Sequence, residues 1–387
     1  FLFAPLNAHG KVIDFSFKDA KFGDVETIKA SLDSKEDHLQ RVAAMDAQFS
    51  GYTRNSKQKN ELPTFNYRIG KNSIKTQTLI DANGNVTITV TGDIKTAQQF
   101  SLNAQLLQNA VVSTGEITNG QWTLPAGSKT ATLTAKMQVA ANVWHAKKSE
   151  FDYRKQPIKI TDSTADLPAG YRIESYYPPK DNFGREQLFE ALGLSLTKDN
   201  TVVIATRTAG IWRIVKGQWQ LFAEGTFDSL GVLVEDNKGL TVIAGQKAEV
   251  TRIRDTNGDG IADSYETLFD AHSYHGNYHS YMHGPVRGGD GAYYVSINLA
   301  DGNDGSTYKA GGQYMGSAGG LAGWNIRIEP NGKFKTWANG LRSPAGLGTA
   351  PDGRLWYSDN QGEYMGTSKV FVIEKDKFYG HPSGLVD

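Results

Sequence analysis

Short apolar runs separated by glycine-rich turns dominate residues 190–387, and they follow one order four times. In each copy a strand that contains Gly leads to a turn, then to a strand of branched and aromatic residues, then to a third strand. The copies begin at Leu192–Leu196, Leu230–Val234, His283–Val286 and Ala345–Gly348. Because short strands at roughly 40- to 50-residue spacing are typical of propellers, the pattern predicts four consecutive β-propeller blades.

The amino-terminal part of the chain has a different pattern. Three of its segments alternate between apolar and polar residues: Thr64–Ile69, Val86–Val90 and Thr130–Thr134. Such alternation predicts half-buried strands, so we expect residues 1–160 to form an antiparallel β-sandwich whose sheets each have one solvent-exposed face. Residues Val25–Met45 are weakly helical by composition. The polar stretch 161–170, which contains Pro168, is the expected linker to a propeller at 171–387.

The expected propeller does not close within this sequence. Four blades are at the lower limit of the known range, and residue 387 follows the last copy without a closing strand. An open ring would leave unpaired strand edges. We therefore expect an all-β chain, a β-sandwich followed by an incomplete β-propeller with about four blades of six. The remaining blades would lie beyond residue 387 or on another chain.

Composition narrows the range of functions. The 41 basic and 41 acidic residues cancel, so no field of one sign favours nucleic acid or an anionic membrane. The absence of cysteine excludes disulfides, thiolate metal sites, a cysteine nucleophile and c-type haem attachment within this chain. No apolar run approaches the ~20 residues of a membrane span.

Residues 255–266 match the calcium loop D-x-[DN]-x-[DN]-G-x5-E. Calcium takes about six to eight oxygen ligands, which this loop can supply. The expected ligands are Asp255, Asn257, Asp259, the Ile261 carbonyl, Asp263 directly or through water, and bidentate Glu266. The segment before the loop alternates like a strand, so we expect a static structural ion rather than a sensor. A solvated acidic turn is the alternative.

The calcium loop also bears on location. Extracellular calcium can fill a weak site, and the chain begins at Phe1 rather than Met, as it would after removal of a signal peptide. We therefore expect the protein in the periplasm or at the cell exterior.

Four of the eight histidines lie in one short stretch, at His272, His275, His279 and His283. On a helix the last three would share a face and could bind a transition metal. Gly276–Asn277 and Gly284–Pro285 would break such a helix, so zinc is the weaker hypothesis. A single histidine acting as general base is the better one, because an ordinary imidazole pKa near 6.5 suits proton abstraction.

A second constellation surrounds Arg342. An arginine followed by Ser343-Pro344 at the start of a blade can present its planar fork to a carboxylate or an electron-rich ring, or it can pair with a neighbouring blade. Asp359 and Asn360 end a strand where propeller loops face a central channel. They are candidates to bind a ligand, and the alternative is that they cap the turn.

Several of these runs resemble a known family. The runs His279–Pro285, Gly340–Leu347, Asp352–Leu355 and Phe378–Pro382 resemble the glucose/sorbosone dehydrogenase family. These are quinoprotein propellers that use pyrroloquinoline quinone. The order of sandwich, calcium loop and propeller further resembles large secreted proteins of planctomycete-type bacteria that join such a propeller to a cytochrome c module. The resemblance covers about residues 60–387.

This resemblance implies roles for particular residues. His279, or else His283, would take the hydroxyl proton of the substrate while hydride leaves for the quinone, and Arg342 would contact the quinone. Asp359 and Asn360 would lie near the cofactor. The Asp255 loop is separate from the calcium that accompanies the cofactor in the family.

Three functions remain open on the sequence. The first is oxidation of a carbohydrate hydroxyl, with electrons passing through the quinone to a cytochrome c module not contained in this chain. The second is a calcium-stabilised propeller without cofactor that binds carbohydrate or protein as a scaffold in a surface assembly. A lactonase-like metal-dependent hydrolase is the third and weakest.

Overall fold

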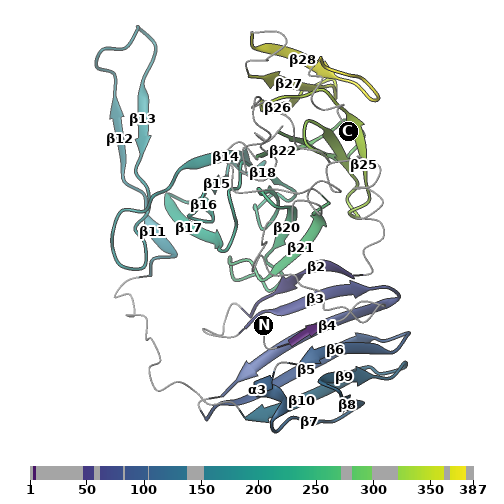
Figure 1. Cartoon of the computed structure of the whole chain (residues 1–387). Coiled ribbons are helices and arrows are strands. Elements are labelled where there is room, and N and C mark those ends of the chain that lie inside the picture. The colour runs from purple at the N-terminus through teal and green to yellow at the C-terminus, as the bar shows by residue number, and fades with distance from the viewer. Residues whose placement is uncertain are drawn as a thin grey trace, which may run out of the picture. The chain divides into compact units, whose positions relative to one another are not determined.

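Antiparallel strands are nearly all of the regular secondary structure described in the computed structural model (Figure 1). It describes residues 3–5, 47–55, 62–81, 83–102, 104–136, 152–271, 281–298, 321–360 and 367–380. The helix expected at Val25–Met45 lies outside these residues. The chain forms two compact units, Phe1–Trp144 with Asp263–Thr267, and His145–Ala262 with Leu268–Asp387. In the described parts, no helix is long and apolar enough to cross a membrane.

Unit 1 is built from two antiparallel sheets. One has the order β2–β3–β4–β5–β10–β7, and the other has the order β1–β6–β9–β8. The strands of the first sheet are β2 (Ala47–Thr53), β3 (Thr64–Ile69), β4 (Asn72–Ile80), β5 (Asn85–Asp93), β10 (Thr130–Lys136) and β7 (Val111–Val112). Those of the second are β1 (Phe3–Pro5), β6 (Gln98–Leu102), β9 (Gln121–Leu124) and β8 (Glu116–Thr118). A single short helix is described here, α3 (Ala104–Leu107).

The core of unit 1 follows from the alternation seen in the sequence. Along β10, Ala131, Leu133 and Ala135 are buried while the threonines between them face outward. The second sheet contributes Phe100 and Trp122 to the same apolar cluster, and both are fully buried. Side chains from the two sheets therefore fill one layer, which is the arrangement of a β-sandwich.

Unit 2 contains a series of blade-like antiparallel sheets. The first is β14 (Ala191–Leu196), β15 (Val202–Thr206), β16 (Ile211–Val215) and β17 (Gln218–Ala223), with β11 (Lys155–Pro157) added beside β17. The second contributes β18 (Gly231–Val234), β19 (Thr241–Gly245) and β20 (Val250–Arg254). The third is β22 (Met282–Arg287), β23 (Tyr293–Ile297), β24 (Asn325–Ile328) and β25 (Phe334–Ala338). The fourth is β26 (Pro344–Thr349), β27 (Leu355–Asp359) and β28 (Lys369–Ile373).

These sheets correspond to the four sequence copies, and the fold class is as predicted: an all-β chain with a sandwich followed by an incomplete β-propeller. One strand, β21 (Ser264–Phe269), begins in the segment that groups with unit 1. There Tyr265 pairs with Tyr52 of β2, and their rings stack with centroids 4.4 Å apart. The predicted domain limits, 1–160 and 171–387, stay a prediction.

The repeated glycine of each copy has a packing role. The first strands of successive blades lie next to one another, β14 by β18, β18 by β22 and β22 by β26. A Cβ atom on Gly231 would lie 2.0 Å from the carbonyl oxygen of Gly284, and one on Gly193 would lie 2.8 Å from the Cα of Gly231. Only glycine allows the strands to approach this closely, so the repeat in the sequence marks the inner strands of the blades.

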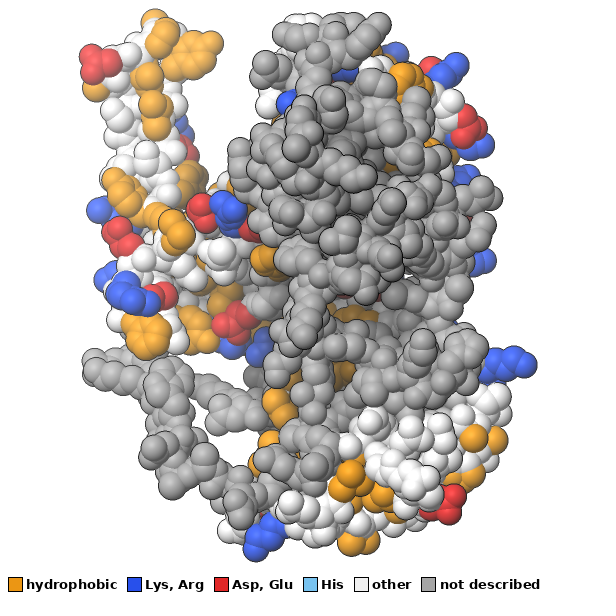
Figure 2. Space-filling view, viewed as in Figure 1, with side chains coloured by type: hydrophobic (Ala, Val, Ile, Leu, Met, Phe, Trp, Pro, Cys, Tyr) orange, Lys and Arg blue, Asp and Glu red, His pale blue; other side chains and the backbone are white. Residues whose placement is uncertain are grey.

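The expected linker at 161–170 falls on a hairpin. Strands β12 (Ile160–Ser163) and β13 (Ile173–Tyr176) pair with each other and extend away from the first blade (Figure 1). Every residue of both strands is exposed. Figure 2 shows hydrophobic side chains on this hairpin, among which Ile160, Ile173 and Tyr176 are about half exposed. The hairpin therefore adds nothing to the buried core.

Candidate functional site

The two ends of the blades carry different chemistry. Because neighbouring strands are antiparallel, the connections β15–β16, β19–β20 and β23–β24 lie at the same end as the links between blades. We call this the upper end. The connections β14–β15, β18–β19 and β22–β23, and the residues that follow β20, lie at the opposite, lower end. His283, Arg342 and Asp359 are at the upper end, and residues Asp255–Ala262 of the calcium loop are at the lower end.

Charged and polar residues from three blades converge at the upper end. Arg207, which follows β15, donates from Nε to Asp228 at 2.9 Å. Lys247, which follows β19, has its Nζ 3.8 Å from the other oxygen of Asp228. The third blade adds Tyr281, whose hydroxyl is 3.5 Å from Arg207 and whose ring centroid is 5.3 Å from the Lys247 ammonium. We call Arg207, Asp228, Lys247 and Tyr281 the upper cluster.

Burial sets the electrostatics of the upper cluster. Lys247 and Asp228 are 6% exposed. Burial lowers the pKa of Lys247, the nearby carboxylate of Asp228 opposes that effect, and the charge of Arg207 adds to it. Two cationic side chains therefore share one buried carboxylate. A buried lysine with a lowered pKa among other titratable groups is typical of functional sites.

His283 extends this cluster into the third blade. Its ring lies edge-on to Tyr281 with centroids 6.4 Å apart. Burial lowers its pKa from 6.5 to about 4, because the charged imidazolium loses solvation. Within the described parts of the chain its ring has no hydrogen-bond partner. His283 is thus a neutral imidazole at physiological pH.

The fourth blade fixes the backbone around Arg342. Asp359 is 2% exposed, and its two carboxylate oxygens accept hydrogen bonds from the backbone N–H groups of Arg342 and Ser343, at 3.1 and 2.8 Å. The N–H of Asn360 in turn donates to the Ser343 carbonyl at 3.2 Å. Asp359 thus holds the start of β26 in place, as the turn-capping alternative requires.

One buried polar atom near this turn is unused. Asn298 is 3% exposed, and its amide nitrogen is 3.4 Å from the Ser343 hydroxyl. Its Oδ1 accepts no hydrogen bond from any described residue. Its backbone N–H donates to the Tyr281 carbonyl at 2.9 Å, so Asn298 connects the third and fourth blades at the upper end. His279, His272 and His275 lie outside the described residues.

At the lower end the calcium loop has an ordered backbone. Asp255 accepts hydrogen bonds from the backbone of Gly258 at 2.6 Å and of Gly260 at 2.8 Å. Asn257 and Asp259 each accept from the backbone two residues on, at 3.0 and 2.9 Å. Gly260 has φ 89°, as the expected sharp turn requires.

The ligand side chains of this loop are of the right chemistry but do not converge. Nowhere in the described residues do three acidic or histidine side chains meet at a point that could hold a metal. The last two expected ligands, Asp263 and Glu266, fall in the segment that groups with unit 1. The turn fits a calcium loop, and binding would require its carboxylates to close around the ion.

The upper cluster was missed by reasoning from the sequence. Arg207, Asp228 and Lys247 carry no motif, and they are separated by strands along the chain. A signal was present in the repeat itself: each lies just after the second strand of a blade or just before the first strand of the next. Aligning the copies by these positions would have grouped them, because both positions lie at the same end of a blade.

One protein family and several solved structures are similar to parts of this chain. A family described as a domain of unknown function, DUF7133, matches residues 216–383. No curated protein matches the chain in sequence. The solved structures to which the chain is similar include glucose and aldose sugar dehydrogenases.

Three of these structures show the extent of the similarity. An oxidoreductase described as a glucose dehydrogenase from Thermus thermophilus is 21% identical over 51% of this chain and 66% of its own, with a TM-score of 0.38. The PQQ-bound aldose sugar dehydrogenase of Streptomyces coelicolor is 16% identical over 59% and 68%, with a TM-score of 0.39. The holo PQQ domain of Coprinopsis cinerea pyranose dehydrogenase is 13% identical over 48% of each chain, with a TM-score of 0.33. The chain thus spans slightly less than two thirds of the Thermus protein.

Proposed function

We propose that unit 2 is the oxidising module of a carbohydrate dehydrogenase and that its reaction takes place at the upper end of the blades. The observation that carries the proposal is the environment of His283. It is a half-buried, neutral imidazole without a hydrogen bond to any described residue, beside Tyr281 of the upper cluster. Oxidation of an alcohol begins with loss of its hydroxyl proton, and a positioned neutral imidazole can accept that proton, although the lowered pKa makes His283 a weaker base than the ordinary imidazole expected from the sequence.

The other upper-end residues would hold His283 and an anionic partner. Tyr281 packs between the ring of His283 and the ammonium of Lys247. Asp228 keeps Arg207 and Lys247 together at this end, and Glu190 lies 3.7 Å from Arg207, so two carboxylates accompany the two cations. The guanidinium fork of Arg207 is well shaped to bind a carboxylate.

The proposed acceptor is pyrroloquinoline quinone, which would take up the hydride of the substrate when bound. The donor set fits this polycarboxylate, because Arg207, Lys247 and Arg342 all lie at the upper end. The backbone of Arg342 is fixed by Asp359, which would spare the cofactor the cost of ordering that turn. Asn360, next to Asp359, remains a proposed cofactor contact.

The proposal includes a calcium ion in the loop 255–266 as a structural element. Its support is the sequence pattern together with the turns fixed by Asp255 and Asp259. The loop is at the opposite end of the blades from His283, so the ion would stabilise the fold and take no part in the reaction. The proposal also includes transfer of electrons to a cytochrome c module. It places the protein in the periplasm or outside the cell.

The test is reconstitution with the quinone and Ca2+, followed by dye reduction on a panel of aldoses. We expect His283→Gln to lower kcat by about 10²- to 10⁴-fold, the usual contribution of a general base, with quinone binding unchanged. Lys375→Ala, an exposed substitution, serves as control. His279→Ala tests the other predicted base.

The pH dependence gives a second readout. Because the pKa of His283 is about 4, its base form persists as pH falls from 7 and is lost only near pH 4. Activity that declines with an apparent pKa near 6.5 would contradict the assignment to His283. A folded protein that binds no quinone would refute the dehydrogenase proposal and favour the scaffold alternative.

A further inference from the structure

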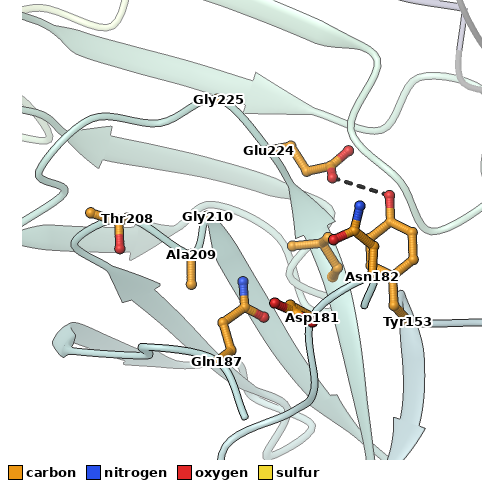
Figure 3. A pocket seen from close by; sticks show the side chains of 10 residues that line it. Tyr153, Asp181, Asn182, Gln187, Thr208, Ala209, Gly210, Glu224 and Gly225 are labelled. Carbon is orange, nitrogen blue, oxygen red and sulfur yellow. Dashed lines mark hydrogen bonds between the residues drawn. The ribbon is translucent and has the colours of Figure 1, made fainter. Parts of the chain in front are cut away.

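A small polar cavity opens in the first blade, apart from His283 (Figure 3). Its volume is about 220 Å³. It is lined by loop residues that precede β14, follow β15 and follow β17, together with Tyr153 and Leu221. We propose that this cavity binds one neutral sugar unit of a carbohydrate.

The cavity offers unused hydrogen-bonding groups. The side chains of Asn182, Gln187 and Thr208 line it, and none of the three forms a hydrogen bond with another described residue. Each amide supplies two donors and an acceptor, and the hydroxyl supplies one donor with acceptor capacity. In Figure 3 the side chains of Asn182, Gln187 and Glu224 project into the same space. A ligand with several hydroxyl groups, each both donor and acceptor, matches this mixed set.

The charges in the cavity are already balanced. Asp181 forms an ion pair with Arg185 at 2.7 Å and also accepts two backbone N–H groups, from Phe183 and Arg185. Glu224 forms an ion pair with Arg154 at 2.6 Å and accepts a hydrogen bond from the Tyr153 hydroxyl at 3.3 Å. No negative charge is left for a cation to neutralise, and no unpaired positive charge lines the cavity to attract an anion. The ligand is therefore uncharged.

Size and rigidity limit the ligand further. A space of about 220 Å³ is smaller than the ~300–1,000 Å³ of drug-sized sites. One wall is backbone at Gly210, which has φ 83° and where an added Cβ would lie 2.3 Å from the Ala223 carbonyl oxygen. Leu221, 5% exposed, lies behind it in an apolar cluster with Trp212 and Trp219. The scale is that of one sugar ring.

The cavity lies at the same end of the blades as the upper cluster. Thr208 directly follows Arg207, and Glu224 precedes Asp228 in the link to the second blade. A longer saccharide held here by one unit would extend over the upper end. The proposal that the cavity binds a sugar unit follows from the geometry of the cavity alone. Only the further step, that the cavity holds a substrate chain for oxidation, rests on the proposed function.

The test measures sugar binding without quinone. Calorimetry on the whole chain would use D-glucose, D-galactose and D-xylose as neutral probes and D-glucuronate as the anionic one. Two pocket variants are tested. One combines Gln187→Ala with Asn182→Ala and removes the two amides, and the other is Thr208→Phe, whose larger side chain fills the mouth of the cavity. Asn237→Ala is the matched control, an exposed amide at the lower end. Thermal unfolding would verify that each variant is folded.

We expect at least one neutral sugar to bind, glucuronate to bind more weakly, and both pocket variants to weaken binding by about tenfold or more, with Asn237→Ala unchanged. No binding of any neutral sugar, tighter binding of glucuronate, or equal binding by the pocket variants would each overturn the proposal. His283→Gln separates the two proposals, because it should leave sugar binding unchanged. Retained sugar binding without dye reduction in wild type means that the dehydrogenase proposal alone has failed.

Discussion

A carboxylate at the lower end, Glu235, joins the second blade to the third. Its oxygens accept hydrogen bonds from Arg252 at 3.1 Å, from Arg287 at 2.8 Å and from the Tyr293 hydroxyl. The side chain is only 17% exposed. Burial alone would raise the pKa of Glu235, but the hydrogen bonds from Tyr293 and Arg287 and the charge of Arg252 outweigh it, so the pKa is lowered.

Glu235→Gln should destabilise unit 2 by about 2 to 3 kcal/mol at neutral pH. Removing one partner of a fully buried ion pair costs about 3 to 5 kcal/mol, and the loss is smaller here because some water reaches the site and the amide oxygen still accepts one hydrogen bond. For a unit of this size the change corresponds to a Tm lower by roughly 5 to 10 °C. Thermal unfolding followed by tryptophan fluorescence measures it.

The control is Glu329→Gln, because Glu329 is 42% exposed in its pair with Arg327. We expect a change below about 0.5 kcal/mol there. The pH dependence provides a further check. A carboxyl with a lowered native pKa adds stability above its unfolded pKa and loses it as pH falls through the native value, so wild type and Glu235→Gln should converge in acid. Equal losses for the two variants at pH 7 would refute the reasoning.

Two further predictions concern the glycine repeat and the calcium loop. Gly231→Ala should cost about 1 to 3 kcal/mol in unfolding free energy, since its Cβ would lie 2.0 Å from a carbonyl oxygen, whereas Gly348→Ala meets nothing within 4 Å. Equal denaturation midpoints would contradict the packing role. A free Ca2+ concentration of about 100 times the Kd of the loop should raise the free energy of unfolding by about 2.7 kcal/mol, and Asp255→Asn should remove that gain. A Tm unaffected by chelator would exclude a structural ion.

The local parts of the fold could be predicted from the sequence. Alternation located the strand Thr64–Ile69, and the predicted segment Thr130–Thr134 lies within the strand Thr130–Lys136, because side chains on a strand point to opposite faces with period two. The blades were found from the recurrence of Gly, turn and strand. His283, Arg342 and Asp359 were named from the sequence, and the chain topology places all three at one end of the blades.

Other features were not accessible in this way. The hairpin β12–β13 occupies a stretch that composition marked as a linker, because two short strands can pair without an apolar face to identify them. The sugar-sized cavity is formed by side chains of ordinary loops. The role of Asp359 also emerged only from its contacts, since an aspartate at a strand end gives no sign whether it faces a ligand or the backbone of Ser343.

The sequence by itself determined what depends on near neighbours along the chain: the strand periods, the turns, the repeated glycines and the calcium pattern. Only the tertiary structure decided which side chains meet at the upper end. Arg207 and Tyr281 come together across 74 residues, on different blades, with Asp228 and Lys247 around them. The physical reason is that local propensity and periodicity act over a few residues, whereas the encounter of loops from separate blades is set by how the inner strands pack.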